Sequence, residues 1–173
     1  MKNVTVAICN THNEAEKVVK DLNEAGFNMK KLSIIGKDYH EEDRVVGFYN
    51  TGDRVANWGK AGAFWGGIWG LIFGAGLFLI PGVGPVVMAG PIVSSLVGAM
   101  EGALVVGGLS ALGGALFSIG IPKDSILKFE SALKADKYLV LATGTEAEIE
   151  KAKNIMESTV SDVTAHSDKK ELV

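Results

Sequence analysis

The stretch AGAFWGGIWGLIFGAGLFLIPGVGP, residues 61–85, decides how this chain is organised. It opens a segment, residues 61–122, that runs for 62 residues with one formal charge, that of Glu101. All the other acidic and basic side chains of the 173-residue chain lie outside it. The sequence therefore predicts two parts of very different polarity, because a segment this apolar needs either a bilayer or an equally dry protein interior.

Two apolar stretches within the segment approach the length of a membrane helix. Residues 63–80 hold 18 residues without a charged or strongly polar side chain, roughly 27 Å as a helix and close to the thickness of the bilayer's hydrocarbon core. Residues 92–119 would span about 42 Å as one helix. Prolines and glycines at 81–91 would break a helix between them, so the pattern predicts a glycine-rich helical hairpin in a membrane. Because that turn carries no charge, a re-entrant or monotopic hairpin and burial in an oligomer are the alternatives.

Small residues follow a regular spacing in both predicted helices. In the first helix they are four glycines at intervals of four, which form one row on its surface. Such a row lets a second backbone approach closely, as in small-xxx-small packing of membrane helices. We expect the two helices to mate and to drive self-association. The glycines assigned to this packing are Gly62, Gly66, Gly70, Gly74, Gly98, Gly102, Gly107 and Gly114.

Three further residues of this region are candidates for a role in a membrane. Trp58 and Trp65 are assigned to the headgroup level, because indole combines an apolar body with one N–H donor. Glu101 is a candidate ion or proton site, since a charge is costly in hydrocarbon. The alternative for Glu101 is a structural pairing with a serine or a backbone group near a helix end or an oligomer interface.

The flanking sequence alternates between strand and helix patterns. Thr11 and Glu14 make a plausible capping box for the first helix, and Gly26 lies where that helix should end. Neither flank can close a sheet alone. We therefore expect one four-stranded ferredoxin-like α+β sandwich, with its helices on one face. The expected strands are 4–9, 32–35, 138–142 and 163–165. The expected helices are one of about 13 residues between Thr11 and Gly26, followed by 124–135 and 147–156. The predicted domains are a discontinuous α+β domain (1–50 plus 122–168), the hairpin (51–121) and a tail (169–173).

Composition excludes several classes of function. The net charge of −3 and the lack of a basic cluster argue against a nucleic-acid partner. With Cys9 as the only cysteine and no histidine at ligand spacing, neither a disulfide nor a zinc site is expected. The acidic run DYHEED, residues 38–43, lacks the spacing of a calcium loop and is interpreted as a solvated loop. We expect no catalytic residues, no metal and no cofactor.

Four motifs carry a resemblance to a known family: GFYNTGDR (47–54), WGKAGAFWGGIWGLIFG (58–74), PGVGP (81–85) and GIPKDSILKFESALKADKYLVLATG (120–144). Together they resemble the bacterial general stress or heat-induced stress proteins, which have an uncharacterised domain and are often labelled as membrane proteins or permeases. The resemblance implies a context of stress. It implies no catalytic residues, because the family has none established to carry over.

The leading hypothesis is a non-enzymatic stress-response protein that self-associates through the glycine hairpin and shapes or stabilises a membrane. Positive residues flank both ends of the apolar segment, which favours the inner membrane with the soluble domain facing the cytoplasm. The expected partners are the lipid bilayer and other copies of the chain. An oligomeric channel or transporter that uses Glu101 and a membrane-anchored sensor of a small ligand are the alternatives.

Overall fold

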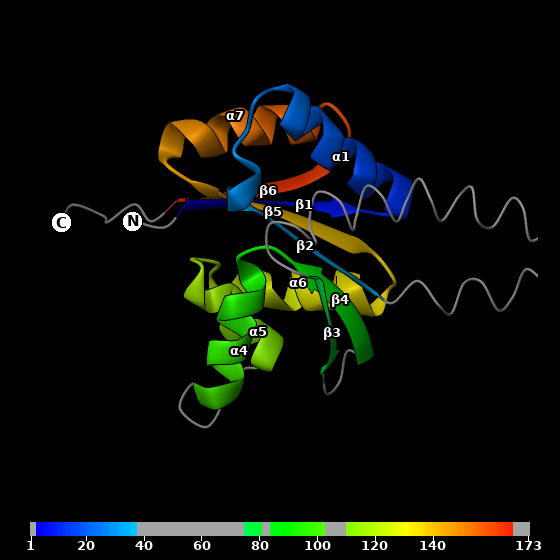
Figure 1. Ribbon diagram of the computed structural model, residues 1–173, viewed down its shortest axis with the longest axis vertical. Coiled ribbons are helices and arrows are strands. Elements are labelled where there is room, and N and C mark those ends of the chain that lie inside the picture. Colours follow the sequence, from blue (N-terminus) through cyan, green and yellow to red (C-terminus); the bar gives the residue numbers. More distant parts are fainter. Residues whose placement is uncertain (1–2, 38–74, 81–83, 103–109, 168–173) are drawn as a thin grey trace, which may run out of the picture.

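A computed structural model of the protein describes residues 3–37, 75–80, 84–102 and 110–167. Its strands form one sheet of six in the order β3-β4-β2-β5-β1-β6, and all neighbours are antiparallel (Figure 1). The strands are β1 (Asn3–Cys9), β2 (Leu32–Lys37), β3 (Ala75–Ile80), β4 (Gly84–Ala89), β5 (Tyr138–Gly144) and β6 (Asp162–His166). The helices are α1 (His12–Glu24), the short 3-10 helix η1 (Met29–Lys31), α4 (Ile92–Gly102), α5 (Ala111–Ser118), α6 (Lys123–Lys134) and α7 (Glu146–Glu157). The α+β class is confirmed.

Helices cover both faces of the sheet. Figure 1 shows α1 and α7 on one side and α4, α5 and α6 on the other. Each side has its own apolar core of fully buried side chains, one under α1 and α7 and one under α4, α5 and α6. The sequence predicts helices on one face, so the second helical layer is a correction. The structure places the helix expected at 124–135, which is α6, in this second layer, on the opposite face of the sheet from α1 and α7.

Strand β1 shows why two covered faces are hard to recognise from the sequence. Its residues alternate between the two faces of the sheet, since Val6 and Ile8 enter one core while Ala7 and Cys9 enter the other. All seven residues are buried, because β1 lies between β5 and β6 and under helices on both sides. Alternation of large and small apolar residues therefore marks two dissimilar cores here, and not a half-exposed strand.

The start of α1 has the predicted capping arrangement with one difference. The Thr11 hydroxyl accepts a hydrogen bond from the Glu14 backbone N–H at 3.2 Å. The Glu14 carboxylate accepts from the Asn10 N–H at 2.7 Å, one residue earlier than the N-cap itself. The helix ends as predicted, with Gly26 in the left-handed region at φ 74°.

The first half of the predicted hairpin is not helical where the structure describes it. Strands β3 and β4 pair with one another, and β4 also pairs with β2. The expected helix at 63–80 and the expected turn at 81–91 are therefore wrong for residues 75–80 and 84–89. A short apolar run bounded by proline and glycine fits a buried strand as well as a helix by periodicity. Pairing of β4 with the open edge of β2 favours the strand over the helix, because that edge presents unpaired backbone N–H and C=O groups.

The second half of the predicted hairpin is two helices, α4 and α5, where one helix over 92–119 is predicted. Ser110 caps α5, and its hydroxyl accepts from the Gly113 N–H at 2.9 Å. This serine is a helix-start signal inside an otherwise apolar run. Within the described ranges, none of the helices combines the length and the apolar character needed to cross a bilayer.

Candidate functional site

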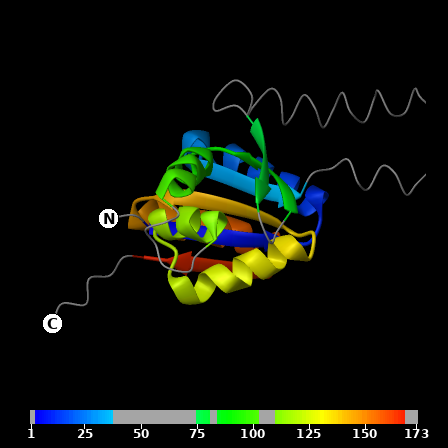
Figure 2. The same ribbon diagram turned by 90° about the horizontal axis from the view of Figure 1, so that it is seen from below.

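The most unusual surface of the described residues is the outer side of the layer formed by α4, α5 and α6, which Figure 2 shows face on. Three large apolar side chains are exposed there: Val97 at 46%, Phe117 at 45% and Leu127 at 69%. They come from α4, α5 and α6, one from each helix. The inner side of the same helices is fully buried. This layer is therefore apolar toward the sheet and partly apolar toward solvent.

Two of the predicted packing glycines, Gly98 and Gly114, have described surroundings, and these surroundings differ. A Cβ on Gly114 of α5 would lie 3.3 Å from the Ala99 Cβ of α4, so small residues bring these two helices close together. Gly98 lies on the exposed side of α4, and a Cβ there would meet nothing within 4 Å. Small-residue packing thus occurs within one copy of the chain at Gly114, while a Cβ on Gly98 meets none of the described residues within 4 Å.

The other predicted residues fall in parts that the structure does not describe. Gly102 and Glu101 belong to the last turn of α4, but their side-chain surroundings lie outside the described residues. The rest lie outside the described ranges altogether: Gly62, Gly66, Gly70, Gly74, Gly107, Trp58 and Trp65. The assignments of these residues stay predictions.

The junction of α5 and α6 contains a polar contact that the sequence reasoning missed. The Ser110 hydroxyl donates to the Glu130 carboxylate of α6 and at the same time caps α5. Gly113 makes room for this contact, because a Cβ there would lie 3.1 Å from Ile126 Cγ2 and 3.2 Å from Glu130 Oε1. A carboxylate at the start of a helix is favoured by the helix dipole. Glu130 therefore attaches the end of the apolar segment to the α+β domain.

A second contact joins the exposed ends of these helices. The Lys123 ammonium lies over the Phe117 ring, 5.7 Å from the ring centroid. Lys123 is the first residue of α6, and Leu127 lies one helical turn later. A cation thus lies beside the exposed apolar side chains of α5 and α6.

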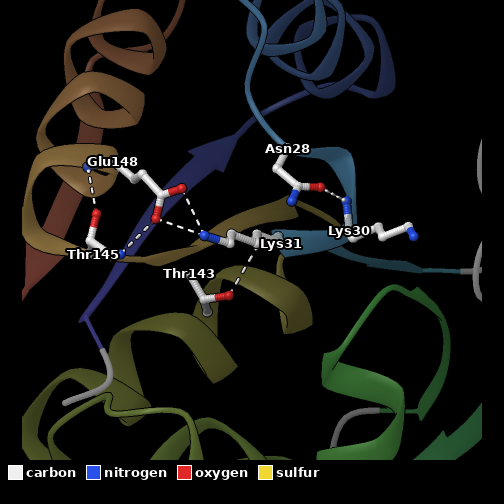
Figure 3. Close-up of polar contacts among 6 residues, drawn as sticks. All are labelled: Asn28, Lys30, Lys31, Thr143, Thr145 and Glu148. Atoms are coloured by element: carbon white, nitrogen blue, oxygen red, sulfur yellow. Dashed lines mark hydrogen bonds and ion pairs between the residues drawn. The ribbon is translucent and has the colours of Figure 1, made fainter.

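On the opposite layer, an ion pair connects the two flanks of the chain (Figure 3). The Lys31 ammonium lies 2.7 Å from both carboxylate oxygens of Glu148. Glu148 also completes the capping box of α7, because its carboxylate accepts from the Thr145 N–H at 2.8 Å. The Thr143 hydroxyl donates to the Lys31 carbonyl oxygen. The Lys31 ammonium, the Glu148 carboxylate and the Thr143 hydroxyl all have hydrogen-bond partners within this cluster, which indicates a structural junction.

The titratable groups of the described residues form no reactive cluster. Burial, with a smaller contribution from Glu14, raises the pKa of the Cys9 thiol to about 12, which keeps it protonated and unreactive. Burial and then the nearby Lys128 ammonium lower the pKa of His166, whose Nε2 is buried without a hydrogen-bond partner. Among the described residues, no group of three or more His, Cys, Asp or Glu side chains could hold a metal ion.

Part of the chain matches the model of a known protein family. No curated protein and no solved structure matches the chain significantly. The match is to a family model and runs from β1 into β3, which includes the motifs at 47–54 and 58–74 but not those at 81–85 and 120–144. It supports the resemblance to stress proteins over that part of the chain. Residues 4–78 match the model of the heat induced stress protein YflT domain.

Proposed function

We propose that this chain is a non-enzymatic stress-response protein in which a compact α+β domain carries residues 61–74, the first part of the apolar segment, into the inner membrane. The segment holds copies of the chain together through its glycine row, and the assembly stabilises or shapes the bilayer. The α+β domain faces the cytoplasm. The stress context rests on the family match to residues 4–78.

The observation that carries the proposal is where residues 38–74 leave and rejoin the sheet. They leave after Lys37 at the end of β2 and rejoin at Ala75 at the start of β3. Only β4 separates these strands, and both Ile34 of β2 and Ala75 of β3 pair with Ala89 of β4. The exit residue Lys37 pairs with Val86, three residues from Ala89 along β4, so exit and return lie about 10 Å apart across the sheet and about 10 Å apart along the strands. This segment is an excursion fixed at both ends to one part of the sheet.

The sequence of that excursion suits a membrane. Its last part, residues 61–74, has no charged side chain and contains all four glycines of the predicted row together with Trp65. Burying so many apolar residues in an aqueous cell requires either lipid or a second copy of the chain. A bilayer accounts for both the missing charges and the regular glycine spacing.

The remaining strands support a ferredoxin-like sandwich as the core of the α+β domain. Four strands follow the order β2-β5-β1-β6, with α1 and α7 together on one face. Without the elements from 75 to 118 and α6, the element order is β-α-β-β-α-β, which is that of the split βαβ fold. In the proposed protein the insertion enters after the second strand of this core, and α4, α5 and α6 cover its other face.

Membrane fractionation of the full chain tests the proposal. Expressed at low level in bacteria, the chain should stay with the membrane pellet through washing with high salt and with alkaline carbonate, and a nonionic detergent should release it. Crosslinking before extraction should give a ladder of species above the monomer. Recovery of a monomer from the detergent-free soluble fraction would overturn the proposal.

A further inference from the structure

We infer that Phe117, Lys123 and Leu127 form a docking face for an anionic lipid surface. This inference rests on the proposed membrane association and adds to it the lipid class and the side of the folded domain that meets the bilayer. The face is built where α5 ends and α6 begins, so it lies at the C-terminal end of the apolar segment.

The three residues are neighbours on one surface. Lys123 lies over the Phe117 ring at 5.7 Å from its centroid, which joins the two helices. Leu127 is four residues after Lys123 in α6, so both side chains project from the same side of that helix. Phe117 is 45% exposed and Leu127 69% exposed, although a leucine in a helix with a well-formed core would normally face inward.

The opposite side of α6 explains why Leu127 cannot turn inward. Ile126, Phe129 and Leu133 are fully buried against the sheet and fill that face of the helix. Leu127 is therefore an additional apolar residue on the outer face, and Phe117, which contacts Lys123 of the same helix, is a second exposed one. Apolar side chains exposed beside a lysine are typical of helices that lie in a membrane interface.

The charges near this face favour an anionic partner. Lys123 lies over the Phe117 ring and one helical turn before Leu127, so its ammonium can contact a lipid phosphate while the two apolar side chains enter the acyl boundary. The acidic residues of α6 are compensated nearby. Asp124 lies in the first turn, where the helix dipole favours a carboxylate, and Glu130 accepts a hydrogen bond from Ser110 at the start of α5. Lys128, on the adjoining side of α6, pairs with Asp162.

An environment-sensitive fluorophore on Leu127→Cys tests the docking in the full chain. The native Cys9 is buried and has a raised pKa, so a maleimide dye at neutral pH reacts with the introduced cysteine. The labelled chain is reconstituted into vesicles of phosphatidylcholine alone or of phosphatidylcholine with phosphatidylglycerol. We expect a blue shift that is clearly larger with phosphatidylglycerol.

Control variants test whether the blue shift is specific to the face formed by Phe117, Lys123 and Leu127. A label on Lys20→Cys, an exposed position of α1 on the other layer, should not shift. Adding Lys123→Glu to the Leu127→Cys chain should lower the docked fraction by on the order of tenfold, whereas adding Lys20→Glu should not.

Three outcomes would overturn the inference, and they are distinguishable. An unshifted label at Leu127→Cys in vesicles that carry the chain refutes the docking face and leaves the membrane association intact. A concentration-dependent shift before vesicles are added identifies a second copy of the chain as the occupant. A chain that does not float with either type of vesicle refutes the proposed function itself.

Discussion

Lys31 and Glu148 form a two-pronged ion pair, with the ammonium 2.7 Å from each carboxylate oxygen (Figure 3). Lys31 immediately precedes β2, and Glu148 lies in the first turn of α7, so the pair joins the part of the chain before the apolar segment to the part after it. Both side chains are 36% exposed. The pair therefore fixes how the two flanks meet, at a point on the far side of the sheet from α4, α5 and α6.

Glu148→Gln should make the folded domain less stable in a pH-dependent way. The Lys31 ammonium, followed by the Thr145 backbone N–H, lowers the pKa of Glu148 to about 2 from its ordinary value of 4.5. A carboxyl group whose pKa is lowered by folding stabilises the protein above its unfolded pKa, and that contribution is lost as pH falls through the folded pKa. The difference in unfolding free energy between wild type and Glu148→Gln should be constant at neutral pH and should vanish between about pH 4.5 and about pH 2.

Urea unfolding followed by circular dichroism at several pH values measures this difference. Glu150→Gln, at an exposed position of the same helix, removes a carboxylate without touching the ion pair and serves as the control. A difference that persists unchanged at pH 2 would show that the charge of Glu148 is not what stabilises the junction.

Gly144→Ala should destabilise the same junction through sterics. A Cβ on Gly144 would lie 2.6 Å from Glu148 Oε2, so the carboxylate would have to leave the capping box. Loss of a helix cap costs about 1 kcal/mol, and we expect a loss of that order in the free energy of unfolding. Gly98→Ala is the opposite case, because the Cβ there meets nothing and alanine favours the helix by about 1 kcal/mol. Equal effects of the two variants in thermal unfolding would contradict the assignment of Gly144.

The sequence predicts the two flanks of this fold well and the apolar segment poorly, for a physical reason. In the flanks, capping residues mark where helices begin and end. Thr11 and Thr145 cap the starts of α1 and α7, and Gly26 follows the end of α1. Between residues 61 and 122 there are almost no polar residues to mark a boundary. There the choice between strand and helix depends on long-range pairing, as when β4 takes the open edge of β2. Ser110 is an exception, since its hydroxyl caps α5 and could have been recognised as a helix start.

The candidate surface was less predictable still. Periodicity places Ile126, Phe129 and Leu133 on the inner face of α6, as the structure confirms. It cannot show that Lys123 lies over Phe117, because that contact depends on the angle at which α5 meets α6. Exposure of Leu127 becomes meaningful only when its neighbours on the other helix are known.

His166 should make the folded protein sensitive to mild acid. Burial and the nearby Lys128 lower its pKa below 6.5, so the folded state binds the proton less readily than the unfolded chain does. Its contribution to stability is therefore complete above pH 6.5 and is lost as pH falls below that value. His166→Phe keeps an aromatic ring beside Phe129, with which His166 makes an edge-to-face contact, and removes the titration. The unfolding midpoint in urea should fall less for this variant than for wild type between pH 7.5 and pH 5, and an identical fall would refute the role of His166.

Gly66→Leu and Gly70→Leu should each weaken self-association without unfolding the α+β domain. In the proposed membrane segment these glycines let a second backbone approach, and a leucine would prevent it. Gly66→Ala keeps the residue small and should preserve the crosslinked ladder. A ladder that is unchanged in Gly66→Leu and Gly70→Leu would count against the glycine row as the contact between copies.

Gly114 and Gly98 should separate packing within one copy from packing between copies. Gly114→Leu would force α5 away from Ala99 of α4, and overpacking of this kind costs about 1–3 kcal/mol, so it should lower the unfolding free energy. A Cβ at position 98 meets none of the described residues within 4 Å, so Gly98→Leu should leave that free energy nearly unchanged. If copies contact one another along α4, Gly98→Leu should nevertheless weaken the crosslinked ladder, because the leucine would project into the neighbour. A Gly98→Leu chain that folds and crosslinks like wild type would restrict the contact between copies to other parts of the apolar segment.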